Sequence, residues 1–336
     1  MGREVNEVLP DWHRDIWRRL SQRQGDGRLP HALLFYGVEG VGKRLFARRF
    51  SQSLLCSHTD AGGEPCGSCH ACQVYSAGNH PDFHWLEPEE TGKAIRIDAV
   101  RELCRELALT PQFGHNKIAV IAPADRLNSA AANALLKTLE EPPDNTLLIL
   151  VSSRPGYLPA TIRSRCQACA FPLPEPGVAL RWLEERGIGE GATLLGIAQG
   201  APFLAAQLAE TDSVERYRKL REELYEIGQG VTDPVKVAAN YSQSDAAEIC
   251  RWMLGNVMDM IRLHWLDQPC PPAQADTDHQ LHRLAKGVEL GQLFELQDAL
   301  VAAQRQLETP VNTQLLLEDL FLRWMDAARK AAGHAL

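Results

Sequence analysis

The stretch HALLFYGVEGVGKRLFARRF, residues 31–50, decides the fold of this chain. HALLFYG is a short apolar run of the kind that forms a buried strand, and KRLFARRF continues with helical spacing. Between them, Gly37, Gly40, Gly42 and Lys43 form the pattern G-x-x-x-x-G-K. After a strand and before a helix, this pattern is typical of a phosphate-binding loop, whose backbone amides and lysine hold phosphate groups. The alternative is a glycine-rich turn with a surface lysine.

Strand-like runs alternate with helical patterns along the first 170 residues. The further expected strands are DFHWLEP (82–88), AIRI (94–97), KIAVIAP (117–123) and TLLILVSS (146–153), and the expected helices are KRLFARRFSQSLLC (43–56), AVRELCRELAL (99–109) and SAAANALLKTLEEPP (129–143). Apolar strands that alternate with helices predict a parallel sheet with crossover helices on its faces. The expected fold class is therefore an α/β domain at the N-terminus.

The pattern changes at the proline-rich segment FPLPEPG, residues 171–177. Beyond it there is no strong strand signal, and residues 178–209 have the pattern of a small helical unit. A helix face with regular leucine spacing is formed by Leu293, Leu296, Leu300 and Leu307. VNTQLLLEDLFLRWMDAARKAA (311–332) predicts a long final helix. We expect an α/β domain, a helical lid and an all-helical C-terminal domain, over residues 1–172, 173–211 and 212–336.

The charge balance and the lack of long apolar runs limit the possible functions. The formal net charge is −8, whereas a surface that binds DNA non-specifically usually carries a basic excess. We therefore do not expect this chain to provide the main grip on DNA. No apolar run approaches the roughly 20 residues that span a bilayer, and MGREVNEVLPDW at the N-terminus lacks the apolar core of a secretory signal. We expect a cytoplasmic protein with no membrane partner.

The residues that would complete a magnesium-dependent ATP site are missing. The position after Lys43 should hold a Ser or Thr hydroxyl that binds magnesium, but it is Arg44, whose guanidinium cannot ligate a cation. The acidic pair expected after the strand KIAVI is replaced by Ala122 and Pro123, and we expect Asp125 to be misplaced for this role. We therefore expect no ATP hydrolysis here. Binding of ATP or ADP stays compatible with the glycines and Lys43.

Four of the nine cysteines form a tight group, in the spacing C-x9-C-x2-C-x2-C: Cys56, Cys66, Cys69 and Cys72. A tight cysteine cluster in a cytosolic chain favours metal over disulfides, and four thiolates suit a closed, tetrahedral structural zinc site. An iron–sulfur site and unligated thiols are the alternatives. The ferredoxin pattern continues with x3-C-P, but Ser76 stands at the position of that cysteine here, which disfavours an iron–sulfur cluster.

Three stretches together resemble the clamp-loader branch of the AAA+ ATPases. They are the phosphate loop with a cysteine module directly behind it, NALLKTLEEPP (133–143) followed by TLLILVSS, and IRSRCQ (162–167). The last contains Ser164, Arg165 and Cys166, which are similar to the SRC motif of that family. LLLEDLFLRW (315–324) also resembles the family's last helix. Within the family, the degenerate ATP site indicates a subunit that is not a motor.

The resemblance implies a hetero-pentameric loader of the DNA polymerase III holoenzyme, which places a sliding clamp on primed DNA. The implied partners are gamma/tau motor subunits, the delta subunit, the clamp (directly or indirectly) and primed DNA through the assembled complex, with the C-terminal helices forming a collar. Arg165 is then similar to an arginine finger that reaches, in trans, the γ-phosphate bound by an adjacent gamma/tau subunit, and Ser164 and Cys166 position it. In the alternative, Arg165 pairs with a carboxylate of its own domain. The lid stretch 196–208 lacks the nucleotide-sensing arginine of active subunits.

Three other functions fit part of the pattern. A motor ATPase of the same family would need magnesium ligands that Arg44, Ala122 and Pro123 do not supply. A small-molecule kinase has the same requirement. A zinc-dependent DNA-binding module with a relic nucleotide fold is disfavoured by the acidic charge balance.

Overall fold

The computed structural model describes residues 8–90, 92–113, 116–241, 245–265, 284–285, 287–307, 309 and 311–333. By its internal contacts the chain divides into two compact units, Met1–Val178 and Ala179–Leu336. The boundary lies next to the proline-rich segment at which the sequence pattern changes. The further division of the second unit into a lid and a collar stays a prediction.

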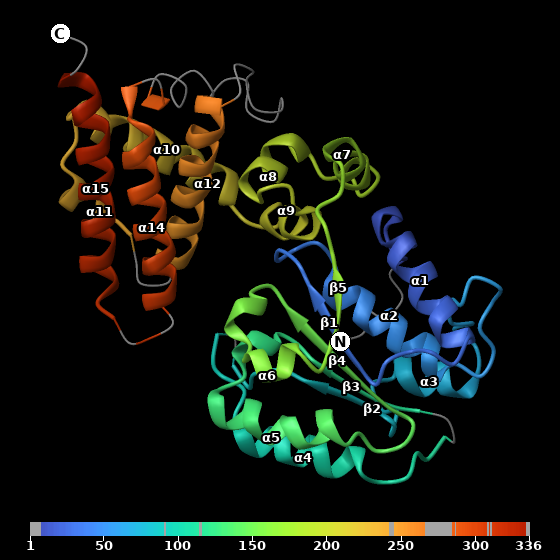
Figure 1. Cartoon of the computed structure of the whole chain (residues 1–336). Helices are drawn as coiled ribbons and strands as arrows, with labels where there is room; N and C mark the ends of the chain where they lie inside the picture. Colours follow the sequence, from blue (N-terminus) through green and yellow to red (C-terminus); the bar gives the residue numbers. More distant parts are fainter. Residues whose placement is uncertain are drawn as a thin grey trace. The chain divides into compact units, whose positions relative to one another are not determined.

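A five-stranded parallel sheet forms the centre of the first unit, with strand order β2-β3-β4-β1-β5 (Figure 1). The strands are β1 (Ala32–Tyr36), β2 (Phe83–Leu86), β3 (Lys117–Ile121), β4 (Thr146–Ser152) and β5 (Gln167–Ala170). β3 and β4 are buried throughout and β1 nearly so, as apolar runs in a parallel sheet require. The predicted α/β class is confirmed.

Helices cover both faces of this sheet (Figure 1). One face is covered by α1 (Arg14–Gly25), α2 (Lys43–Leu55) and α3 (His70–Ser76), and the other by α4 (Ile97–Leu107), α5 (Ser129–Glu140) and α6 (Ala160–Arg163). Because successive side chains of a strand point to opposite faces, Leu33 and Phe35 pack in the first hydrophobic cluster, and Ala32 and Leu34 pack in the second. β1 therefore contributes to both cores.

An aromatic cluster holds α2 against the sheet, and Phe46 lies at its centre with no exposed surface. Its ring centroid lies 5.0–5.7 Å from those of Phe171, Phe35, His13 and Trp17, in edge-to-face arrangements, which are favourable for aromatic pairs. These contacts join α2 to β1, to the start of α1 and to the segment that follows β5. They fix the position at which the phosphate loop enters α2.

In the first unit one predicted strand is wrong, and the α-helices α1, α3 and α6 and the strand β5 were not predicted. In AIRI (94–97), only Ile95 forms an isolated bridge, to Leu127, and α4 already begins at Ile97. The run is short and flanked by polar residues, so its backbone enters a helix instead of a ladder. β5 and α1 lacked a recognised signal: β5 is mostly exposed and has only four residues, and α1 is rich in polar residues around three buried positions.

Within the described residues, the regular elements of the second unit are all helices, joined by turns and loops. α7 (Pro176–Glu184) crosses the boundary between the units, and it is followed by α8 (Gly191–Ile197), α9 (Pro202–Leu208), α10 (Ser213–Gln229), α11 (Pro234–Ala238), α12 (Ala246–Trp265), α14 (Leu290–Gln306) and α15 (Thr313–Gly333). Trp324 of α15 is buried and donates to the carbonyl oxygen of Leu224 at 2.8 Å. Leu293, Leu296 and Leu300 are buried on α14 as predicted, whereas Leu307 lies past the helix end and is half-buried.

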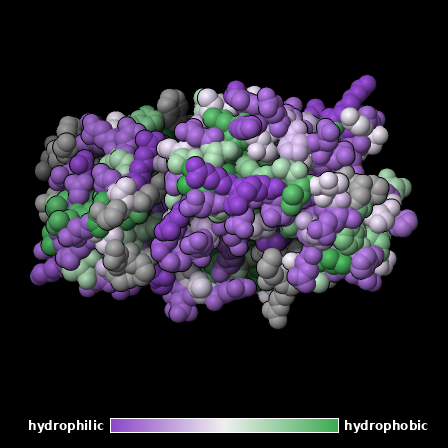
Figure 2. Space-filling model, turned by 90° about the horizontal axis from the view of Figure 1, so that it is seen from below, coloured by the Kyte–Doolittle hydropathy of each residue, from purple (hydrophilic) through white to green (hydrophobic). Residues whose placement is uncertain are grey.

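Hydrophilic side chains predominate on the face of the molecule seen in Figure 2, and hydrophobic side chains form limited patches there. Within the described residues, no helix combines the length and the apolar character needed to cross a bilayer.

Replacing Phe46 by Ala should lower the free energy of unfolding of the first unit by about 3–5 kcal/mol, because it removes a fully buried ring and leaves a cavity. Leu109→Ala, at a position that is 58% exposed in the same unit, should cost under about 0.5 kcal/mol. Urea unfolding monitored by amide hydrogen exchange of β1 and β4 measures both. Equal effects of the two substitutions would contradict the central role of Phe46.

Candidate functional site

The phosphate loop connects β1 to α2 and depends on glycine at its first position. A Cβ added to Gly37 would lie 2.2 Å from the carbonyl oxygen of Phe171, so only glycine allows this close approach to the segment after β5. Gly42, the residue before α2, has φ 96°, a left-handed value that favours glycine. The predicted strand, loop and helix therefore occur in that order, and the loop lies at the carboxyl end of the sheet.

Lys43 is engaged by the loop itself. Its Nζ donates to the carbonyl oxygens of Gly37 at 2.8 Å and Val38 at 2.6 Å, and to Ser153 Oγ at 3.1 Å. The residue is only 5% exposed, and this burial lowers the pKa of its ammonium group to about 8. A buried charge needs such partners. The loop carbonyls supply them, so the loop is held closed on the lysine.

Arg44 occupies the space where the strands β2 and β3 end. Its Nη1 donates to the carbonyl oxygen of Ala122 at 3.3 Å, and Nη2 forms an ion pair with Glu87. Trp85 Nε1 donates to the same carboxylate at 3.0 Å. Burial opposes ionisation of Glu87, but these hydrogen bonds outweigh it and lower the pKa. A protein cation therefore neutralises the carboxylate next to the loop.

Asp125 holds the end of β4. Its side chain is 4% exposed, and Oδ1 accepts from Ser152 Oγ at 2.6 Å and from the backbone N–H of Ser153 at 3.2 Å. Oδ2 lies 3.5 Å from Arg154 Nε. The carboxylate and both serines thus have structural contacts, and Ser153 links them to Lys43.

Two residues at the loop lacked a distinctive sequence signal. Trp12 Nε1 donates to the carbonyl oxygen of Val41 at 3.2 Å. His13 packs among the aromatic rings around Phe46, and burial lowers its pKa to about 4. It is therefore neutral at pH 7. In the sequence, the one feature that could have pointed to these two residues is a tryptophan and a histidine directly before a helix.

Arg165 lies in the turn between α6 and β5 and contacts its own domain. Its Nη2 is 2.6 Å from Glu140 Oε1, and Nη1 donates to the carbonyl oxygen of Thr161 at 2.8 Å. Ser164 Oγ donates to the same carbonyl at 3.2 Å. Cys166 packs against the second hydrophobic cluster, and burial raises the pKa of its thiol to about 11. In the chain alone, Arg165 thus has the intradomain carboxylate partner of the alternative interpretation.

The structure places Arg165 and the phosphate loop at opposite ends of the sheet. β5 and β1 are parallel and Ala170 pairs with Tyr36, so the loop after β1 lies at the carboxyl end of both strands. Arg165 precedes β5 and lies at the amino end. At about 3.3 Å per residue, the two are separated by roughly 20 Å along the strands. The structure therefore does not bring Arg165 together with Lys43 of the same chain.

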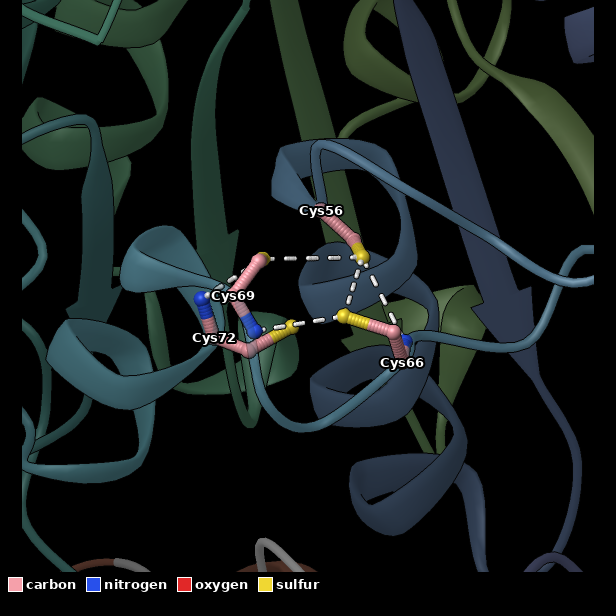
Figure 3. Close-up of side chains that lie close together, drawn as sticks. All are labelled: Cys56, Cys66, Cys69 and Cys72. Carbon is pink, nitrogen blue, oxygen red and sulfur yellow. Dashed lines mark hydrogen bonds between the residues drawn. The ribbon is translucent and has the colours of Figure 1, made fainter.

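The four predicted cysteines converge on one point after α2 (Figure 3). All four Sγ atoms lie within 4.8 Å of one another, with Cys56 Sγ 3.5 Å from that of Cys66 and 3.9 Å from that of Cys69. Four sulfurs about 2.3 Å from one tetrahedral zinc ion would be separated by about 3.8 Å. The cluster therefore has the dimensions of a four-thiolate metal site.

Backbone N–H groups point at the sulfurs of this cluster. The N–H groups of Cys66 and His58 donate to Cys56 Sγ at 3.3 and 3.4 Å, and that of Cys69 donates to Cys66 Sγ at 3.3 Å. The hydrogen bonds from Cys69 and from Ser68 lower the pKa of Cys66 to about 6, whereas burial raises that of Cys72. Such N–H groups favour thiolates, the form that binds metal.

Comparisons with known proteins match both halves of the chain. Residues 12–175 match the family described as "DNA polymerase III, delta subunit", and residues 211–326 match "DNA polymerase III, delta subunit, C terminal". A solved gamma-subunit-related protein of DNA polymerase III from Thermotoga maritima has a TM-score of 0.45 and 16% identity, covering 94% of this chain and 100% of that chain.

Several curated relatives align along most of their length. DNA polymerase III subunit delta' of Pseudomonas aeruginosa is 33% identical over 95% of this chain and 97% of its own. The subunit delta' of Escherichia coli strain K12 is 32% identical over 93% and 94%, and that of Bacillus subtilis 34% over 67% and 66%. Identity at this level along nearly the whole length of both proteins shows that this chain belongs to the family of DNA polymerase III delta' subunits.

Proposed function

We propose that this chain is a non-hydrolysing subunit of the DNA polymerase III clamp loader, which helps to load the sliding clamp onto primed DNA in the cytoplasm. The observation that carries the proposal is the separation of Arg165 from the phosphate loop of its own chain. An arginine at the far end of the sheet can contact a nucleotide only if that nucleotide is bound by a neighbouring subunit. A ring with gamma/tau motors and the delta subunit supplies such neighbours.

The loss of hydrolysis rests on the charges at the loop. Arg44 stands where a magnesium-binding hydroxyl is needed, and its guanidinium pairs with Glu87 and Ala122. A fixed cation there repels a second one, and no acidic pair follows β3. The same features count against the motor ATPase and kinase alternatives.

Arg165 is then the arginine finger for the adjacent gamma/tau site. In the free chain its charge is balanced by Glu140, but the side chains of both residues are partly exposed, 35% and 50%. Ion pairs of this exposure contribute only about 0–1 kcal/mol. The Arg165 guanidinium can therefore exchange Glu140 for a γ-phosphate, which carries more negative charge than one carboxylate.

Zinc is the metal that fits the cysteine cluster. The site consists of four sulfurs with no open position, which is the arrangement of structural zinc. It closes the loop that follows α2, so we infer that it stabilises the module and takes no part in catalysis.

The purified chain should contain about one zinc ion, measured by elemental analysis. Cys66→Ser combined with Cys69→Ser should abolish zinc binding, because two thiolate ligands are lost. Cys104→Ser removes a thiol outside the cluster and should retain the metal. Less than roughly half an equivalent in the unaltered chain would contradict a zinc site.

The isolated chain should show no magnesium-dependent ATP turnover, because its site lacks ligands for the metal. A coupled assay at saturating ATP, with the Lys43→Ala variant as the background control, measures this. Turnover on the order of 1 s⁻¹ that disappears in Lys43→Ala would refute the non-hydrolysing assignment.

Arg165→Ala should lower the ATPase rate of a loader reconstituted with gamma/tau, delta, the clamp and primed DNA. A trans-acting arginine raises the hydrolysis rate roughly 10³–10⁵-fold at the ATP site that it contacts. Total ATP turnover of the loader should therefore fall by nearly all of the part that the adjacent gamma/tau site contributes. Arg163→Ala, two residues earlier and exposed, is the matched control and should leave the rate unchanged. An unchanged rate in Arg165→Ala, with assembly intact, would make Arg165 structural.

A further inference from the structure

A groove runs along the outer edge of β5, next to α1. It has a volume of about 750 Å³ and is lined by both elements and by the loop between α1 and β1, a size found in ligand sites. All of its lining residues belong to the first unit. Neither the phosphate loop nor Arg165 lines it, so the proposed function does not use it.

On the side of this groove, no strand of the described residues pairs with β5, which is the last strand of the sheet and pairs with β1 on its other side. The carbonyl oxygen of Ala168 accepts a hydrogen bond there from the side chain of its neighbour, Gln167 Nε2, at 3.4 Å. The N–H of Phe171 donates to Tyr36 at 2.7 Å, and in a parallel ladder alternate residues face the same neighbour. Gln167 and Cys169 therefore also face β1, while the N–H and C=O groups of Ala168 and Ala170 face outward.

Three arginines line the groove: Arg19, Arg23 and Arg28. Arg19 and Arg23 are one helical turn apart on α1 and so share a face. Within the described residues, none of the three guanidinium groups has an ion pair or hydrogen bond, whereas Arg14 and Arg18 on the same helix pair with Asp11 and Asp15. Asp26 is the one carboxylate among the lining residues. In a chain with a net charge of −8, this local excess of positive charge is unusual.

We propose that the groove binds an acidic, extended peptide segment of a partner protein, which adds to the sheet as a strand beside β5. Strand addition supplies donors and acceptors for both the N–H and the C=O groups of Ala168 and Ala170. Successive side chains of an added strand alternate between the two faces. Acidic residues at every second position therefore face α1 and its arginines.

The backbone pattern favours a peptide over nucleic acid. A phosphate backbone would satisfy the arginines, but its oxygens are acceptors and donate nothing to the outward carbonyls of β5. A peptide strand matches the charges and the alternating backbone groups together. Single-stranded DNA is therefore the competing ligand in the test.

The probe is a fluorescein-labelled peptide of four Glu-Thr repeats, titrated with the full chain and followed by anisotropy. Saturable binding is expected. Arg19→Glu combined with Arg23→Glu should weaken it by about tenfold or more, because two attractive charges become repulsive. Arg14→Glu combined with Arg18→Glu makes the same charge change on the part of α1 away from the groove and should change the affinity less than about twofold.

Two further probes separate strand addition from general charge attraction. A peptide of the same composition with Glu-Glu-Thr-Thr repeats should bind at least several-fold more weakly, and Ala168→Pro should weaken the Glu-Thr peptide, since it removes an outward N–H. Absence of saturable binding, equal binding of the two peptides, or an Arg19 and Arg23 double variant that binds normally would overturn the proposal. The proposal would also be overturned if an oligothymidylate of equal charge bound more tightly than the Glu-Thr peptide and the Arg19 and Arg23 double variant abolished that binding.

Discussion

The packing of Phe46 against Phe35 and Phe171 is the contact on which the functional end of the first unit depends. Through this packing, the first turn of α2 contacts β1 and the segment that follows β5. The phosphate loop lies between these elements, and Gly37 approaches the backbone of Phe171 so closely that no side chain fits there. The loop therefore owes its shape to the hydrophobic core beneath it.

The charges around the loop are balanced by groups of the chain itself. An unpartnered ammonium or guanidinium near a core is costly, yet Lys43 is satisfied by the loop carbonyls and Arg44 by Glu87 and Ala122. Both cations are thus part of the structure of the free chain. Phosphate binding would require Lys43 to exchange these carbonyls for a ligand. The proposed loss of hydrolysis is compatible with this architecture, because both cations have partners within the chain.

The sequence was informative where one physical signal dominates. Buried strands such as β3 and β4 are continuous apolar runs, and the cysteine spacing alone predicted a group whose sulfurs the structure brings within 4.8 Å. β5 escaped prediction because an exposed edge strand of four residues has no apolar pattern. The pattern of residues 94–97 predicts a strand that the structure does not contain, because an apolar pair in a short run does not distinguish a single bridge from a ladder. The pairs of Arg165 with Glu140 and of Arg44 with Glu87 join residues distant in sequence, and no local pattern specifies them.

The separation of Arg165 from the phosphate loop follows from the parallel topology itself. In a parallel sheet all carboxyl ends lie at one edge, so a loop that follows a strand and a turn that precedes the neighbouring strand are separated by the strand length. Two functional groups placed in this way cannot act on one ligand within one chain, but they suit a repeating arrangement in which each subunit faces the next. A subunit can then lose chemistry at its own loop without altering the group that it offers to its neighbour. The proposed loss of hydrolysis at the loop and the proposed role of Arg165 toward a neighbouring subunit are consistent with each other for that reason.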